Sequence, residues 1–412
     1  MSRHGMDAAR VELEKYTKAC YELMKSGTER KQDKVPMIPT YLHGDKPVPQ
    51  LKKAAVIDAG GTNFRTALAH FENGECVFEN LSHHQMPGTE KPSDWAEFIS
   101  FCADCIEPLL AQTDEIGFCF SYPAEVTPER DSRVLSLTKQ VKILGAEGKL
   151  LGAALNDELV RRGLIRKKIV VLNDTPATLL GGSALLDKTQ YGGFIGMVAG
   201  TGVNSCCMLP ECEITKLCMS GSEKMLINLE SGSVDVFPRG DFDLEMDADL
   251  PDTGEYVGEK MCSGYYLGEL CRYTLRAAAK ENIFSEGAAE YLIGLEKLTT
   301  PEVDGWVSGK TPACFSDEDA ESAVYIIQEI FDRAARCMAC VLCAILMLTG
   351  EGKEKPVCIA VDGSLFKKSR LFRPMLEKYM TEYAEKVLCR SFEFVTNDET
   401  SLLGTVAAVL LN

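Results

Sequence analysis

Two pairs of apolar runs, each joined by a glycine turn, dominate the pattern of hydrophobic positions along the chain. Ala54 to Ile57 has the pattern of a buried strand, Gly60-Gly61-Thr62 of a tight turn, and Ala67 to Phe71 of a returning strand. The same order recurs at residues 194–209, where the turn is Ala199-Gly200-Thr201-Gly202. Two similar hairpins in one chain predict a duplicated α/β core in which the glycine turns face each other.

Other segments show helical or strand periodicity. Residues 7–26 place Leu13, Tyr16, Cys20 and Leu23 on one face of a helix. The pattern predicts further helices over 95–111, 150–163, 176–186, 260–282, 320–348 and 402–411, and strands at 74–88, 116–122, 168–172 and 357–361. Residues 123–148 are charged and irregular, which predicts an exposed segment outside the core.

Length and charge narrow the class of protein. A chain of 412 residues is too long for one core, so two lobes are expected. The net charge of −17 argues against a nucleic-acid partner or an anionic membrane surface. The apolar run from Cys337 to Leu348 is too short to span a bilayer, and the polar first ten residues do not resemble a signal peptide.

The 17 cysteines predict reduced thiols in a cytoplasmic protein. Cys337, Cys340 and Cys343 share one helical face in an apolar run, which favours buried packing over a metal site. Cys102 and Cys105 have metal-like spacing but no partner pair. All five histidines precede residue 85, so a general base in the remaining chain must be Asp, Glu, Lys or Tyr.

The first hairpin carries a candidate anion site. Glycines at 60 and 61 let backbone N–H groups approach a phosphate, and Thr62, Asn63 and Arg65 add donors. No Gly-Lys-Ser/Thr follows, so this is not a Walker loop, and alone the turn also fits an ordinary hairpin. A third turn, Asp362-Gly363-Ser364, opens a helical stretch of the kind that holds phosphate or ribose oxygens.

Asp174 is the candidate general base. It follows a predicted strand, and sites in α/β proteins gather at the carboxyl ends of strands. An aspartate just before Pro176 also fits a cap of the next helix, and the same dipeptide recurs at Asn156-Asp157. Both interpretations stay open on spacing alone.

Taken in order, these motifs resemble the hexokinases, the ATP-dependent sugar kinases of the actin-like ATPase superfamily. The resemblance covers most of the chain. It rests on Pro36 to Pro39, Asp58 to Arg65, Phe118 to Pro123, Thr138 to Lys142, Gly145 to Gly148, Asn173 to Thr175, Gly200 to Asn204, Ile227 to Glu230, Glu259 to Leu270 and Val361 to Ser364. Two positions depart from the family pattern: Gln140 stands where a glycine is common, and Ser231 stands where a tryptophan is common. These departures bear on sugar specificity more than on the reaction.

The resemblance implies a two-lobed α/β fold of the actin-like ATPase (ribonuclease H-like) class, with mixed sheets and an interlobe cleft. The expected small lobe comprises residues 52–173 plus 398–412, and the expected large lobe comprises 1–51 plus 174–397. The implied reaction transfers the γ-phosphoryl group of ATP to the 6-hydroxyl of a hexose, with glucose as the first expectation. Kinases for fructose, mannose or an amino sugar, a non-catalytic sugar sensor and a filament-forming ATPase are the alternatives.

The resemblance also implies roles for individual residues. Asp174, Lys139 and Arg65 are the expected catalytic residues. The expected sugar ligands are Ser121, Thr138, Lys139, Asn173, Asp174, Asn204, Glu230 and Glu259. The expected nucleotide ligands are Asp58, Gly60, Gly61, Thr62, Asn63, Thr201, Gly363 and Ser364, with Mg²⁺ bound to Asp58 through water. The expected partners are therefore a small-molecule hexose and ATP.

Overall fold

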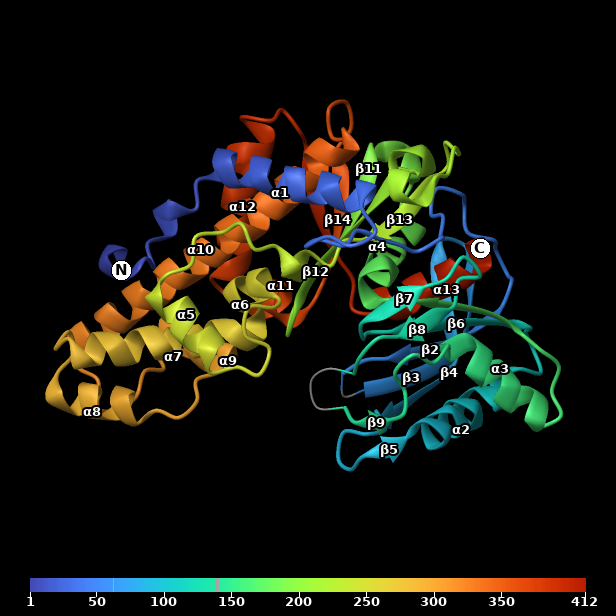
Figure 1. Cartoon of the computed structure of the whole chain (residues 1–412), viewed down its shortest axis with the longest axis horizontal. Helices are drawn as coiled ribbons and strands as arrows, with labels where there is room; N and C mark the ends of the chain where they lie inside the picture. Colours follow the sequence, from blue (N-terminus) through green and yellow to red (C-terminus); the bar gives the residue numbers. More distant parts are fainter. Residues whose placement is uncertain (62, 138–140) are drawn as a thin grey trace.

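A computed structural model describes residues 1–61, 63–137 and 141–412 and contains two main β-sheets (Figure 1). The six-stranded sheet has the order β1 (Ile38–Pro39), β13 (Lys224–Asn228), β12 (Val203–Pro210), β11 (Gly193–Ala199), β14 (Val357–Asp362), β15 (Phe392–Thr396). The five-stranded sheet has the order β10 (Lys168–Leu172), β6 (Glu115–Phe120), β2 (Ala54–Ala59), β3 (Asn63–Glu72), β4 (Glu75–Gln85).

The two sheets repeat one plan. In the first, β2 and β3 form an antiparallel hairpin, and β6 and β10 run parallel to β2. In the second, β11 and β12 form the hairpin, and β14 and β15 run parallel to β11. All six residues of β2 are buried, as expected of a strand covered on both faces. The predicted duplicated α/β core with mixed sheets is confirmed.

Two helices connect the sheets. Helix α4 (Asp174–Ala184) packs on β11, β12 and β14, and α13 (Thr400–Leu411) packs on β2, β6 and β10. The helices also pack on each other where the two sheets meet (Figure 1). A Cβ atom on Gly404 would lie 1.8 Å from the Ala177 carbonyl oxygen, so a side chain at that position would separate the pair. The resulting fold is two-lobed, while the exact lobe boundaries stay a prediction.

The remaining helices surround these sheets. Helices α2 (Trp95–Ile106) and α3 (Leu151–Arg161) cover the five-stranded sheet. The larger lobe adds α1 (Leu13–Glu29), α5 (Asp241–Ala248), α6 (Val257–Cys262), α7 (Gly264–Lys280), α8 (Glu286–Gly294), α9 (Thr300–Val307), α10 (Asp317–Thr349), α11 (Ser364–Lys368) and α12 (Phe372–Met380). Helix α10 is capped by Ser316 and ends at Gly350, whose φ of 73° suits glycine.

Three local predictions were wrong. The helix expected over 260–282 is two helices, α6 and α7, because Ser263 between them is extended with ψ 154°. The strand expected from Ala67 already begins at Asn63. The segment 123–148 is not wholly exposed: it contains β7 (Ala124–Val126), β8 (Ser132–Val134) and β9 (Ile143–Leu144), and Val134 is fully buried. Strands of two or three residues are too short to give a periodic signal.

The cysteines behave as expected from the sequence. All are free thiols, and Cys337, Cys340 and Cys343 are fully buried in α10. Burial raises the pKa of each of these three thiols. In the described part of the chain, no group of three or more Cys, His, Asp or Glu side chains is arranged to hold a metal ion. None of the helices described there has the length and apolar character needed to cross a membrane.

Candidate functional site

Three parallel strands of the five-stranded sheet end at the same edge. Asp58 of β2 lies opposite Cys119 of β6, and Cys119 lies opposite Leu172 of β10. The residues that follow these strands are therefore neighbours. The Ser121 N–H donates to the Ala59 carbonyl at 3.2 Å, and the Tyr122 hydroxyl donates to the Gly60 carbonyl at 2.8 Å. This edge brings together Gly60, Ser121, Asn173 and Asp174.

Asp174 is the first residue of α4, not its cap. The cap is Asn173, whose side-chain oxygen accepts from the Thr175 N–H at 3.1 Å. Asp174 Oδ1 accepts from the Thr175 hydroxyl at 3.2 Å. Its carboxylate is close enough to Cys119 that its charge, with that of Asp58, adds to the effect of burial in raising the pKa of that thiol. The structure therefore removes the capping interpretation for Asp174.

Glu259 lies against the second glycine turn. Its Oε2 accepts from the Val203 N–H at 3.0 Å, and a Cβ atom on Gly202 would lie 2.5 Å from the same oxygen. The Gly264 N–H donates to the Gly200 carbonyl at 2.8 Å, so the start of α7 supports the turn. The turn, α6 and α7 are thereby held in one unit.

Asn204, Asn228 and Glu230 form a hydrogen-bonded group beside this turn. Glu230 Oε1 accepts from Asn228 Nδ2 at 2.7 Å and from Asn204 Nδ2 at 3.3 Å. Asn204 Nδ2 also donates to Asn228 Oδ1 at 2.8 Å. Burial raises the pKa of Glu230, and the nearby charges of Asp174 and Glu259 raise it further, against the lowering effect of the amide donors. Three carboxylates from different elements thus converge.

Arg65 is bound by two carboxylates. Its Nε and one terminal nitrogen donate to Asp58 Oδ2 at 3.1 and 2.5 Å, and the other terminal nitrogen donates to Glu399 at 2.9 Å. The Ser401 hydroxyl also donates to Asp58 Oδ2, at 3.1 Å. The first hairpin is therefore tied to the start of α13. Glu399 and Ser401 were not predicted, since they lie more than 300 residues away in sequence.

Gly363 follows β14 and packs against the second glycine turn. Its φ is 110°, and a Cβ atom there would lie 2.4 Å from the backbone of Ala199. A Cβ atom on Gly200 would in turn lie 3.4 Å from the Ser364 nitrogen. Gly363 and Ser364 therefore lie beside the turn that holds Thr201. Asp362 Oδ1 accepts from the Gly363 N–H at 2.7 Å and from Lys367 at 2.8 Å, which fixes this junction.

Some sequence candidates lie outside the described residues, and a third residue, besides Glu399 and Ser401, was missed. Thr62, Thr138 and Lys139, together with Gln140, lie outside the described residues. Asn228 was not predicted, although it bonds to both Asn204 and Glu230. Its spacing gives no strand signal, because β13 ends at Asn228 and Glu230 lies beyond it with a left-handed φ of 56°.

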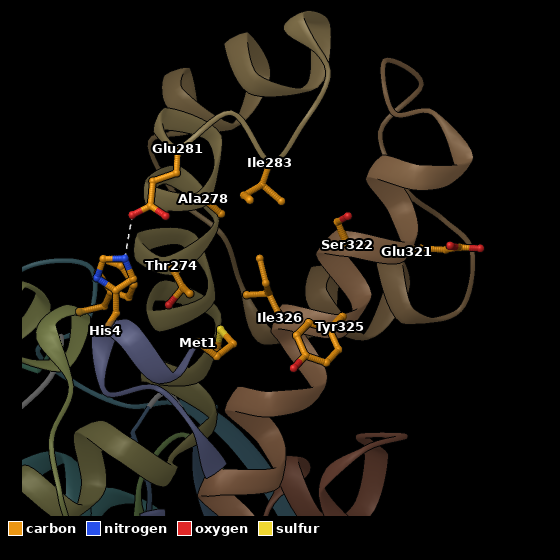
Figure 2. Close-up of a pocket in the computed structure, with 11 residues that line it drawn as sticks. Met1, His4, Thr274, Ala278, Glu281, Ile283, Glu321, Ser322, Tyr325 and Ile326 are labelled. Carbon is orange, nitrogen blue, oxygen red and sulfur yellow. Dashed lines mark hydrogen bonds and ion pairs between the residues drawn. The ribbon is translucent and has the colours of Figure 1, made fainter. Parts of the chain in front are cut away.

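A cavity of about 410 Å³ lies away from these residues, at the other end of α7. It is lined by Met1, His4, Phe242, Thr274, Ala278, Glu281, Ile283, Glu321, Ser322, Tyr325 and Ile326. Figure 2 shows Ile283 and Ile326 pointing toward each other, with His4 bonded to Glu281 at one side. Thr274 is ten residues from the start of α7, or roughly 15 Å along the helix. None of the candidate catalytic or binding residues lines this cavity.

Comparisons with known proteins show which proteins this chain resembles. The chain is 28% identical over 391 residues to Hexokinase-1 of Schizosaccharomyces pombe, covering 86% of this chain and 78% of that protein. It is 27% identical over 408 residues to Hexokinase-1 of Saccharomyces cerevisiae, covering 89% and 81%. A hexokinase from Schistosoma mansoni complexed with glucose has the same fold, with a TM-score of 0.80, 22% identity and coverage of 99% and 98%.

Two protein-family models match the chain and assign it to a family. One model described as hexokinase matches residues 3–184, and a second model described as hexokinase matches residues 194–411. Their border falls between α4 and β11, where the second copy of the sheet plan begins. The chain belongs to the hexokinase family.

Proposed function

We propose that this protein transfers the γ-phosphoryl group of ATP to the 6-hydroxyl of a hexose, with glucose as the first substrate to test. The observation that carries the proposal is the position of Asp174 at the start of α4, where its charge and that of Glu259 both act on Glu230. The glucose complex of the Schistosoma mansoni relative and the names of the curated relatives support the substrate class. The finer choice among hexoses is part of the proposal.

Phosphoryl transfer depends mainly on positioning and on charge stabilisation. Asp174 would orient the sugar hydroxyl and accept its proton, while Lys139 and Arg65 would offset charge on the transferred group. Arg65 would act from the position that Asp58 and Glu399 give it. The proposed sugar ligands are Ser121, Thr138, Lys139, Asn173, Asn204, Glu230 and Glu259. Those that the structure describes come from both lobes, so closure of the lobes would exclude water.

The residues around the glycine turns fit a nucleotide. A Cβ atom on Gly61 would meet nothing within 4 Å, so the first turn is open to a ligand. The proposed nucleotide ligands are Asp58, Gly60, Gly61, Thr62, Asn63, Thr201, Gly363 and Ser364. Asp58 supplies one buried carboxylate, which fits Mg²⁺ because this ion is usually bound by one or two carboxylates together with phosphate oxygens and waters. Bound Mg²⁺ would neutralise phosphate charge.

The direct test measures ADP release with ATP, Mg²⁺ and a panel of glucose, fructose, mannose and an amino sugar. We expect sugar-dependent release, and the panel identifies the preferred hexose. Release that is independent of sugar would contradict the proposal. Sugar binding without turnover would favour a sugar sensor. A cytoplasmic location is also proposed and can be tested by fractionation, since a relative from Nicotiana tabacum is named chloroplastic.

The affinity for hexose should depend on the charge of Glu230. Burial, Asp174 and Glu259 raise its pKa, so it takes up a proton at a higher pH than an ordinary glutamate. Because the pKa of Glu230 is raised in the folded chain, protonation of Glu230 stabilises the folded state. This stabilisation is lost as the pH rises through the folded-state pKa. An ionised carboxylate only accepts hydrogen bonds, so protonation should weaken sugar binding as the pH falls.

Calorimetric titration with glucose at a series of pH values measures the pH at which the affinity for glucose changes. Glu230→Gln should remove that transition, and identical wild-type and variant profiles would refute the assignment.

A side chain at Gly363 should disturb the nucleotide turn. Gly363→Ala meets the backbone of Ala199 at 2.4 Å and takes a backbone conformation reserved for glycine, at a cost of about 1–3 kcal/mol. We expect a lower unfolding free energy in urea and a higher KM for ATP. Gly294→Ala is the matched control, since its added Cβ meets nothing within 4 Å. Wild-type stability in Gly363→Ala would contradict the clash.

A further inference from the structure

A buried ion pair joins Asp247 to Lys260, the residue next to Glu259 in the sequence. Lys260 follows Glu259 in α6, and its side chain is only 4% exposed. Its Nζ donates to Asp247 Oδ1 of α5 at 2.7 Å and to the Asp252 carbonyl at 2.7 Å. The same ammonium is 3.2 Å from the Asp252 carboxylate. Glu259 and Lys260 are consecutive, so any movement of one backbone moves the other.

The carboxylate of Asp247 connects three segments. Besides Lys260, it accepts from the Gly254 N–H at 3.1 Å and from Arg239 at 2.9 Å. The Thr253 hydroxyl donates to the Asp247 carbonyl at 3.1 Å. Asp247 therefore holds α5, the loop 249–256 and α6 together.

The start of α6 has little stability of its own. The helix has six residues, too few to be stable without tertiary contacts. It begins after Tyr256, whose φ of 48° is unfavourable for a bulky residue. Strained backbone of this kind persists only where the surrounding contacts determine it. Here those contacts include the bonds of Asp247 to Gly254 and Lys260, together with the burial of Val257 and Met261.

We propose that Lys260 and Asp247 are positioning residues for the Glu259 carboxylate in the hexose site. This inference rests on the proposed role of Glu259 as a sugar ligand. Stability alone is a poor reason for the pair, because buried ion pairs are often replaceable by apolar residues without loss. Helix α5 also has a second buried pair, Asp243–Arg333, which already attaches it to α10. The Asp247–Lys260 pair is the one that reaches the helix of Glu259.

Lys260→Met tests the proposal by steady-state kinetics and by calorimetric titration with glucose. A displaced ligand can lower activity on the order of 10²-fold. We therefore expect kcat/KM for the hexose to fall by that order through a higher KM, with a smaller change in the KM for ATP. Asp247→Asn/Lys260→Met removes both charges but keeps an acceptor for Arg239 and the Gly254 N–H. It should recover part of the thermal stability while leaving the KM for the hexose high.

Lys167→Met is the matched control. The Lys167 side chain is 5% exposed, and its Nζ donates to Asp114 Oδ1 at 2.5 Å. Lys167 precedes β10, at the opposite end of that strand from Asn173, so its loss should lower stability and leave both KM values unchanged. A Lys260→Met variant that behaves like Lys167→Met would overturn the positioning role. So would failure of both Lys260 variants to fold, since the pair would then act on stability. A wild type that neither binds nor phosphorylates any hexose would instead reject the proposed function itself.

Discussion

Replacing Asp174 with asparagine should lower kcat by about 10²–10⁴-fold, the usual range for loss of a general base. Asparagine keeps the shape of the side chain but cannot accept the proton of the sugar hydroxyl. The cap of α4 belongs to Asn173 and stays intact, so the variant should fold normally. Coupled measurement of ADP release gives kcat, and circular dichroism checks the fold.

The chain contains its own control for this experiment. Asn156-Asp157 on α3 repeats the dipeptide Asn173-Asp174, and Asp157 forms an exposed ion pair with Arg166. Asp157→Asn should leave kcat unchanged and alter stability by about 0–1 kcal/mol, as for surface ion pairs. Wild-type turnover by Asp174→Asn would exclude Asp174 as the base.

Replacing Arg333 with methionine should cost about 3–5 kcal/mol of unfolding free energy, the range for breaking a buried ion pair. Arg333 and Asp243 form two bonds of 2.6 Å, and their side chains are 1% and 3% exposed. The loss of Arg333 leaves a buried carboxylate without its cation. Urea denaturation of the purified variant measures the change.

The double variant Arg333→Met/Asp243→Asn separates charge from packing. Asparagine can still accept from the Gly240 N–H, as Asp243 does at 2.7 Å, but carries no charge. We expect the double variant to recover much of the lost stability. Equal loss in the single and double variants would mean that packing around Arg333, not the unpaired charge, determines the cost.

The hairpins and the parallel strands were predictable because their signals are local. A buried run, a glycine turn and a second run specify β2–β3 and β11–β12 within twenty residues each. The position of Asp174 at a strand end was equally local. The choice between base and cap was not, because it depended on the Asn173 side chain turning to the Thr175 N–H.

The parts that the sequence could not predict depend on contacts between distant segments. Arg65 has a partner, Glu399, that lies 334 residues away, and the Glu230 group depends on two strands meeting side by side. Similarly, the break at Ser263 follows from the bond of the next residue to the second turn, not from a proline or a change in periodicity. Glu259 therefore lies on a short helix that the sequence did not distinguish from α7.

The distribution of exposed and buried thiols allows local unfolding of this protein to be measured by thiol alkylation. Cys212, Cys218, Cys314 and Cys389 are exposed and should react with an alkylating reagent at once. Cys102 and Cys119 belong to the five-stranded half, whereas Cys337, Cys340 and Cys343 belong to α10, and all five are buried. Their reaction therefore requires transient unfolding of the element that covers them. Mass spectrometry of the alkylated chain over time would thus record the opening rate of each lobe separately, without any engineered label.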